Sequence, residues 1–141
     1  MRGQFEFKRL NNYPHLKPED VFIWERFLGK FPGAYDSVDY DFGVGALPEF
    51  SRAVVQEIGV GELSLYKKKI DVVGYKGDQP DIIEVKPNAS ASALGQLWQY
   101  GVLYKNYFNP DIEPKLVLIT NRILPDMNLL AYTLGIKIVV V

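Results

Sequence analysis

The sequence predicts an α/β protein, with a mixed central β-sheet flanked by helices on both faces. Stretches with the apolar spacing of helices alternate along the chain with short strand-like runs, which is the pattern of this class. Two of these runs, 81–87 and 114–120, are nearly all apolar, as in strands covered on both faces. The chain has 141 residues and 48% hydrophobic content, which suffices for one core, so a single domain over 1–141 is expected.

Two strands and two helices are expected in the first half of the chain. A short strand is expected at 4–7. Pro18 and the acidic residues behind it predict a helix over 18–31, because proline suits a first helical position and carboxylates complement the positive end of the helix dipole. Apolar residues alternate with aspartates over 34–45, which indicates a half-solvated strand whose aspartates face water. Helical spacing over 47–59 predicts the second helix.

The second half predicts a hairpin followed by alternating helices and strands. The residues GDQP between the two hairpin arms are typical of a turn. Proline ends the second arm, and a serine can cap the helix that follows. The expected ranges are the arms 63–75 and 81–87 around the turn 77–80, the helices 90–108 and 125–135, and the strands 114–120 and 136–141.

Charged residues interrupt the apolar arms of this hairpin. Side chains alternate along a strand, so Glu84 and Lys86 share one face of the second arm. Asp71 lies between Ile70 and Val72 in the first arm, and pairing across the turn would bring it near Glu84. Buried charges cost several kcal/mol each unless they are paired or bound to an ion, as a rough estimate. These residues are therefore expected to have a partner.

Two chemical readings of these residues remain open. Two carboxylates that converge at a sheet edge suit a hard divalent cation such as Mg²⁺, and Asp71 and Glu84 would be its ligands. The bound ion would activate water, and Lys86 would orient that water or stabilise the charged transition state. The alternative is a structural ion pair of Lys86 with either carboxylate.

The order of these residues resembles the PD-(D/E)XK nuclease superfamily, which has the restriction-endonuclease-like fold. Asp71 resembles its metal-binding acid, and Glu84-Val85-Lys86 resembles its ExK sequence. The resemblance implies that Asp71, Glu84 and Lys86 are catalytic, and that the Val85 backbone carbonyl is a further metal ligand. It covers roughly residues 18–120, and its central third is the specific part.

The helix after the hairpin extends the resemblance to the RecB-like branch of the superfamily. Gln96 and Tyr100 stand four residues apart on one helical face, as in the QxxxY helix of that branch. The resemblance implies that Gln96 supports the active site. The family often adds an acid from its first helix, for which Glu25 is the choice here, with Glu57 and Glu62 as rivals.

One apparent match to the family motif is rejected on geometry. Pro80-Asp81 spells the "PD" of the family name. Asp81, however, precedes Glu84 by three residues on the same strand, so the two side chains point to opposite faces. Asp71 is therefore the better candidate.

The resemblance implies a Mg²⁺- or Mn²⁺-dependent hydrolase, a nuclease that cleaves DNA phosphodiester bonds. One alternative is a module on the same fold that only binds nucleic acid or protein. Another is a wholly structural charge network in an unrelated α/β domain. Whether cleavage would be of the endonuclease or exonuclease kind, and on which DNA strands, stays open.

Composition limits the partners. The net charge of -1 and the pI near 5.8 do not fit a surface that grips DNA over its whole area, but Lys67, Lys68 and Lys69 could meet a phosphate backbone. The chain has no cysteine, which excludes thiolate chemistry. No signal-like or membrane-spanning run is found, so a cytoplasmic protein without a membrane partner is expected. The apolar strand 136–141 could support a homodimer.

Overall fold

The computed structural model describes residues 2–44 and 68–141 of the chain. The expected helix over 47–59 and the first residues of the expected strand 63–75 lie outside the described residues. Three candidate site residues lie outside them as well: Glu57, Glu62 and Lys67.

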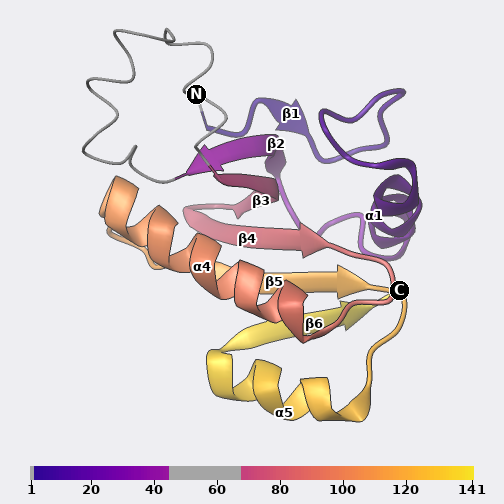
Figure 1. Cartoon of the computed structure of the whole chain (residues 1–141). Coiled ribbons are helices and arrows are strands. Elements are labelled where there is room, and N and C mark those ends of the chain that lie inside the picture. Colours follow the sequence, from indigo (N-terminus) through magenta and orange to yellow (C-terminus); the bar gives the residue numbers. More distant parts are fainter. Residues whose placement is uncertain (1, 45–67) are drawn as a thin grey trace, which may run out of the picture.

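The described residues form one six-stranded mixed sheet (Figure 1). The strands lie side by side in chain order, antiparallel from β1 to β4 and parallel from β4 to β6. This confirms the predicted mixed sheet. The strands are β1 (Phe5–Glu6), β2 (Ser37–Val44), β3 (Lys68–Lys76), β4 (Gln79–Val85), β5 (Lys115–Thr120) and β6 (Ile136–Val140).

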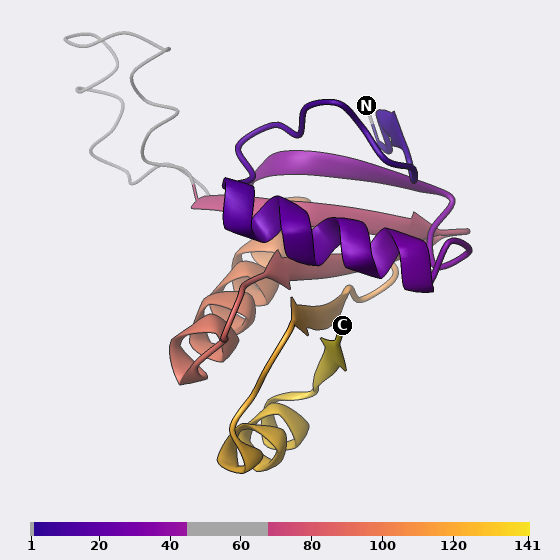
Figure 2. The same cartoon turned by 90° about the vertical axis from the view of Figure 1, so that its right-hand side faces the viewer.

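Three described helices cover the two faces of the sheet (Figure 2). The helix α1 (Pro18–Lys30) lies on one face, while α4 (Ala91–Phe108) and α5 (Pro125–Leu134) lie on the other. This confirms the α/β class, and Pro18 begins α1 as predicted. No helix in these two ranges is both long and apolar enough to cross a membrane.

The hairpin turn is tighter than the predicted 77–80. Only Gly77 and Asp78 form it, and Gln79 already pairs with Lys76. Gly77 adopts a positive φ of 56°, a conformation that glycine takes without steric cost. Such a two-residue connection fixes which residues of β3 and β4 face each other.

Each face of the sheet has its own apolar core. Leu94, Leu97 and Tyr100 of α4 pack on one face, and Ile23, Trp24 and Phe27 of α1 pack on the other. The strands between the two cores are therefore covered on both sides, which explains their nearly continuous apolar sequence.

The regular alternation of side chains between the two faces of the sheet is interrupted at the same position in β2 and β3. Tyr40 and Val72 pair and belong to the core under α1, whereas Phe42 and Ile70 pair and pack in the core under α4. Between these pairs, the ladder skips Asp41 and Asp71, and Asp41 has a positive φ of 53°. Asp71 thus sits at a break in the regular alternation of the sheet.

The first aspartate of β2 does not face water, so that expectation was wrong. Asp39 is buried, with 4% of its surface exposed. Its carboxylate accepts hydrogen bonds from the backbone N–H groups of Gly3 at 2.9 Å and Gln4 at 2.7 Å, and from the hydroxyl of Tyr75 at 2.8 Å. These three donors hold the N-terminal segment against β2 and β3.

We expect Gly74→Ala to lower the free energy of unfolding by about 2 kcal/mol, because overpacking a core has a cost of this order. A Cβ at Gly74 would lie 2.7 Å from the nearest ring carbon of Tyr35, and the ring cannot move without disturbing the core under α1. Urea unfolding measures the change. Gly95→Ala is the control, since a Cβ there meets nothing within 4 Å and helical alanine is preferred by roughly 1 kcal/mol. Equal effects of the two substitutions would contradict this account.

Candidate active site

The hairpin brings Asp71 and Glu84 together. The β3–β4 ladder ends at the pair Val72–Ile83, and Asp71 and Glu84 occupy the next position along both strands. The backbone N–H of Val85 donates a hydrogen bond of 3.0 Å to Oδ2 of Asp71. The tight turn and the strand register therefore place the two carboxyl groups side by side, as the sequence predicts.

Glu84 is buried, and Asp71 beside it is partly buried. Glu84 has 6% of its surface exposed, and its Oε2 has no hydrogen-bond partner among the described residues. Burial is the largest cause that raises the pKa of Glu84, followed by the negative charge of Asp71 and a hydrogen bond between the two side chains. Burial also raises the pKa of Asp71, and the hydrogen bond from Val85 opposes that rise.

This pair is an unusual arrangement for a purely structural site. Two adjacent carboxylates repel each other, and the repulsion is strong where little water screens it. Without a cation, the pair relieves the repulsion by holding a proton. A divalent cation would remove the same repulsion and occupy the unpartnered oxygen of Glu84, so the donor set fits a hard metal ion.

Lys86 lies at the exposed edge of this pair. Its backbone N–H donates to the carbonyl of Ile119 at 3.0 Å, which ties the end of β4 to β5. Its side chain is exposed, and its positive charge acts on both Asp71 and Glu84. Lys86 takes part in none of the salt bridges found within residues 2–44 and 68–141. The alternative of a direct structural ion pair with Lys86 therefore has no support in this geometry.

Asp20 is an acidic side chain of α1 that interacts with the pair. Asp20 is buried at 8% exposure, and its negative charge raises the pKa of both Asp71 and Glu84. Burial likewise raises the pKa of Asp20, and Lys86 is among the groups that oppose this rise. Lys86 therefore stands near three acidic side chains.

Glu25, the acid of this helix that the sequence analysis chose, forms its contacts elsewhere. Its carboxylate forms a 2.6 Å salt bridge with Arg9 and accepts a hydrogen bond of 3.2 Å from Tyr13, away from the pair. A signal for Asp20 was present in the sequence. Asp20 precedes Ile23 and Trp24 by three and four residues, so it shares their buried face of α1.

The helix α4 brings Tyr100 to the carboxyl pair. Tyr100 is buried, and its pKa is raised first by burial and then by the charges of Glu84 and Asp71. Gln96, one turn earlier, is exposed, and no hydrogen bond joins it to either carboxyl group in the described part of the chain. Of the two residues of the helix pattern, Tyr100 therefore interacts with the pair, whereas the contact expected from Gln96 is not found in the described part of the chain.

Asp81 lies on the other face of β4. Its Oδ2 accepts a hydrogen bond of 2.8 Å from the hydroxyl of Tyr35, which belongs to the core under α1. Glu84 instead interacts with Tyr100 on the face covered by α4. This confirms the argument from strand alternation that separated Asp81 from the pair.

The remaining candidates are peripheral to the pair. Lys68 and Lys69 are exposed at the start of β3, two or three residues before Asp71. Val85, whose carbonyl is a candidate ligand, ends β4. No group of three or more acidic or histidine side chains in the described ranges is arranged to hold a metal ion. An ion at this place would therefore depend on two carboxylates, water and substrate oxygens, a set that Mg²⁺ commonly uses.

No family model, curated protein or solved structure matches this chain. The site is therefore interpreted from its own geometry and charge.

Proposed function

We propose that this protein is a Mg²⁺- or Mn²⁺-dependent nuclease that hydrolyses DNA phosphodiester bonds. The observation that carries the proposal is the adjacent carboxyl pair of the partly buried Asp71 and the buried Glu84, near the exposed Lys86; one oxygen of Glu84 has no hydrogen-bond partner among the described residues. A site with this charge pattern attracts a divalent cation and then an anionic substrate.

Asp71 and Glu84 would hold the ion in this proposal, with the Val85 carbonyl as a further ligand. Asp20 adds negative charge behind them. The bound ion would supply an acidified water and neutralise charge on the phosphate. The hydrogen bond from Val85 keeps one oxygen of Asp71 in place, so the pair does not have to be ordered when the ion arrives.

Lys86 acts on the substrate in this proposal. Its exposed ammonium group would bind a phosphate oxygen and stabilise the negative charge that develops during hydrolysis. The exposed Lys68 and Lys69 lie on the strand that carries Asp71, where they could contact neighbouring phosphates. These positive groups favour a polyanion such as DNA over a neutral substrate.

We expect Lys86→Ala to reduce metal-dependent cleavage about 100-fold or more, since removing one group that stabilises transition-state charge has effects of this size. Supercoiled, linear and branched DNA would be incubated with Mg²⁺, Mn²⁺ or a chelator, and the products separated on gels. Lys105→Ala is the matched control, because Lys105 is an exposed lysine that pairs with Glu113.

Two results would count against this function. Cleavage that persists in the presence of chelator would contradict the requirement for a metal ion. Full activity of Lys86→Ala would contradict the proposed role of Lys86. DNA binding without cleavage of any substrate in either metal would support the non-catalytic binding module instead.

A further inference from the structure

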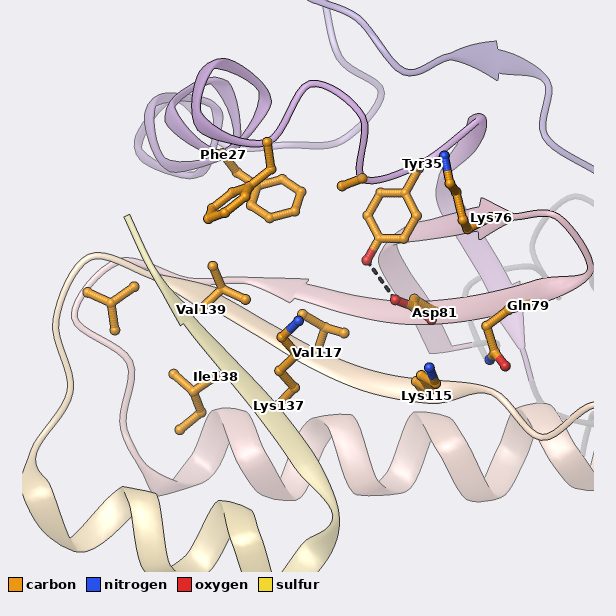
Figure 3. A pocket seen from close by; sticks show the side chains of 13 residues that line it. Phe27, Tyr35, Lys76, Gln79, Asp81, Lys115, Val117, Lys137, Ile138 and Val139 are labelled. Carbon is orange, nitrogen blue, oxygen red and sulfur yellow. Dashed lines mark hydrogen bonds between the residues drawn. The ribbon is translucent and has the colours of Figure 1, made fainter.

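A cavity lies under the end of α1, on the face of the sheet opposite Glu84 (Figure 3). It has a volume of about 660 Å³ and lies between the end of α1, the segment that follows it, and strands β4, β5 and β6. Only one described helix, α1, covers this face, and its contacts with the sheet reach β4 and β5. The volume is in the range of small-molecule sites.

The floor of this cavity is a set of side chains brought together by the strand register. Asp81 of β4 pairs with Lys115 of β5, and Val117 of β5 pairs with Lys137 of β6. Because alternate residues of a strand share a face, all four side chains point to the α1 side. Residues more than 50 positions apart in the chain thereby form one surface, as Figure 3 shows.

Asp81 lines this cavity and has one carboxyl oxygen that lacks a partner among the described residues. Its Oδ2 is occupied by the hydroxyl of Tyr35, but its Oδ1 is buried and has no partner among the described residues. Burial raises the pKa of Asp81, while the bond from Tyr35 and the charges of Lys115 and Lys137 oppose the rise. A buried acceptor without a donor is costly, so a ligand N–H group would be favourable here.

The lysines give the cavity a positive charge. Lys76 is paired with Asp36 at 3.3 Å and also donates to the carbonyl of Gly33. Lys115 and Lys137 are exposed and take part in none of the salt bridges among the described residues. Together they outweigh the single charge of Asp81, so an anionic group would be attracted.

The opposite wall is apolar and aromatic. Phe27 and Phe31 of the α1 end stand with ring centroids 5.3 Å apart, and Phe31 is 45% exposed. Val117 and Val139 add apolar surface to the floor from β5 and β6. A flat ring could pack against this wall, because exposed aromatic surface favours stacking.

We propose that this cavity binds a nucleoside monophosphate. The base would pack against the Phe31 side of the cavity and donate an amino hydrogen bond to Oδ1 of Asp81, and the phosphate would bind Lys115 and Lys137. An aromatic ring, an N–H donor and a phosphate are the three features that the cavity can satisfy at once. The residues of this cavity lie on the face of the sheet opposite Glu84. The inference therefore does not rest on the proposed nuclease activity.

Calorimetric titration of the full chain with deoxyadenosine monophosphate, deoxyadenosine and inorganic phosphate tests the site. We expect a dissociation constant below about 1 mM for the nucleotide. Deoxyadenosine alone and inorganic phosphate alone should each bind at least about tenfold more weakly, because the nucleoside and the phosphate use separate parts of the cavity. Lys115→Gln and Lys137→Gln should each weaken nucleotide binding about tenfold, the usual size for a charge-assisted contact. Lys8→Gln is the control, since Lys8 is exposed and pairs with Glu6 on β1.

Asp81→Asn separates base recognition from simple charge attraction. The substitution makes the cavity more positive, so inorganic phosphate should bind more tightly, whereas the nucleotide should bind several-fold more weakly because the acceptor loses its charge. Tighter binding of the nucleotide would overturn the role of Asp81. No heat and no shift of the Tyr35 and Val117 resonances with about 10 mM nucleotide would overturn the site.

The nucleotide could be free or the end of a DNA strand. A 5′-phosphorylated tetranucleotide distinguishes these sources. Tighter binding than the monophosphate identifies a strand end, and weaker binding identifies the free nucleotide; both results support the cavity as a nucleotide site. Equal binding of all ligands to wild type and Lys137→Gln would contradict it.

Discussion

Asp71→Asn is expected to abolish metal-dependent DNA cleavage, by about 1000-fold or more, and at the same time to stabilise the fold. The loss follows because a ligand carboxylate of the proposed metal would be removed, and such ions contribute several kcal/mol to charge stabilisation. The gain follows because a like charge beside the buried Glu84 disappears. The asparagine oxygen can still accept the hydrogen bond from Val85, so the hairpin should keep its shape.

The stability gain should depend on pH in a defined direction. Burial raises the pKa of both Asp71 and Glu84 in the folded protein above the unfolded values. The folded state therefore binds more protons than the unfolded state between those values. The contribution of the pair is fully present at pH below the ordinary carboxyl pKa and is lost as pH rises through the raised pKa values. Wild type should thus lose stability towards alkaline pH, and Asp71→Asn should lose less.

Urea unfolding at several pH values measures this effect. At about pH 8, Asp71→Asn is expected to be more stable than wild type by roughly 1 kcal/mol, and the difference should shrink at about pH 5. Adding Mg²⁺ should stabilise wild type by mass action and leave the variant unchanged. Asp78→Asn, in the exposed hairpin turn, is the control for a change of net charge.

This experiment separates a metal centre from a structural pair. If Asp71→Asn were less stable than wild type at every pH, the pair would be a favourable structural contact. If the variant were more stable and the unfolding free energy of wild type did not change with Mg²⁺ or Mn²⁺, the repulsion within the carboxyl pair would be supported but the proposed metal site would be wrong.

Asp39→Ala is expected to cause the largest loss of stability, about 3 to 5 kcal/mol. The substitution removes a carboxyl group that accepts hydrogen bonds from two backbone N–H groups and from the hydroxyl of Tyr75. The buried hydroxyl of Tyr75 would be left without this acceptor at a cost of about 1 to 3 kcal/mol, and the two partly buried bonds from Gly3 and Gln4 would add about 1 kcal/mol each. The short strand β1 pairs with β2 through two residue pairs, Phe5–Val38 and Glu6–Ser37, so the hydrogen bonds to Asp39 are a large share of the polar contacts that hold this segment, beside the packing of Phe5 and Phe7.

Chemical denaturation and limited proteolysis test this prediction together. The unfolding midpoint should fall, and the segment before α1 should be cut faster than in wild type. Asp111→Ala, at an exposed bend, controls for the loss of a carboxylate. A loss below about 1 kcal/mol would show that water or other groups satisfy the three donors equally well.

Much of the fold follows from local patterns. Pro18 begins α1 as predicted, and helix α4 occupies nearly the whole range that its apolar spacing indicates. The alternation of side chains along β4 was enough to separate Asp81 from Glu84, and hairpin pairing was enough to bring Asp71 to Glu84. These features depend on neighbours in the chain or across one tight turn, where backbone geometry leaves few choices.

The rest depends on how distant elements pack, which no local pattern specifies. Which acid of α1 approaches the pair depends on the rotation of that helix over the sheet, so Asp20 and not Glu25 lies there. Asp39 is buried because a segment some 35 residues earlier folds over it. The cavity under the end of α1 is lined by residues of β4, β5 and β6, which meet only in the folded sheet. Side-chain spacing tells which residues share a face, whereas long-range packing chooses what covers that face.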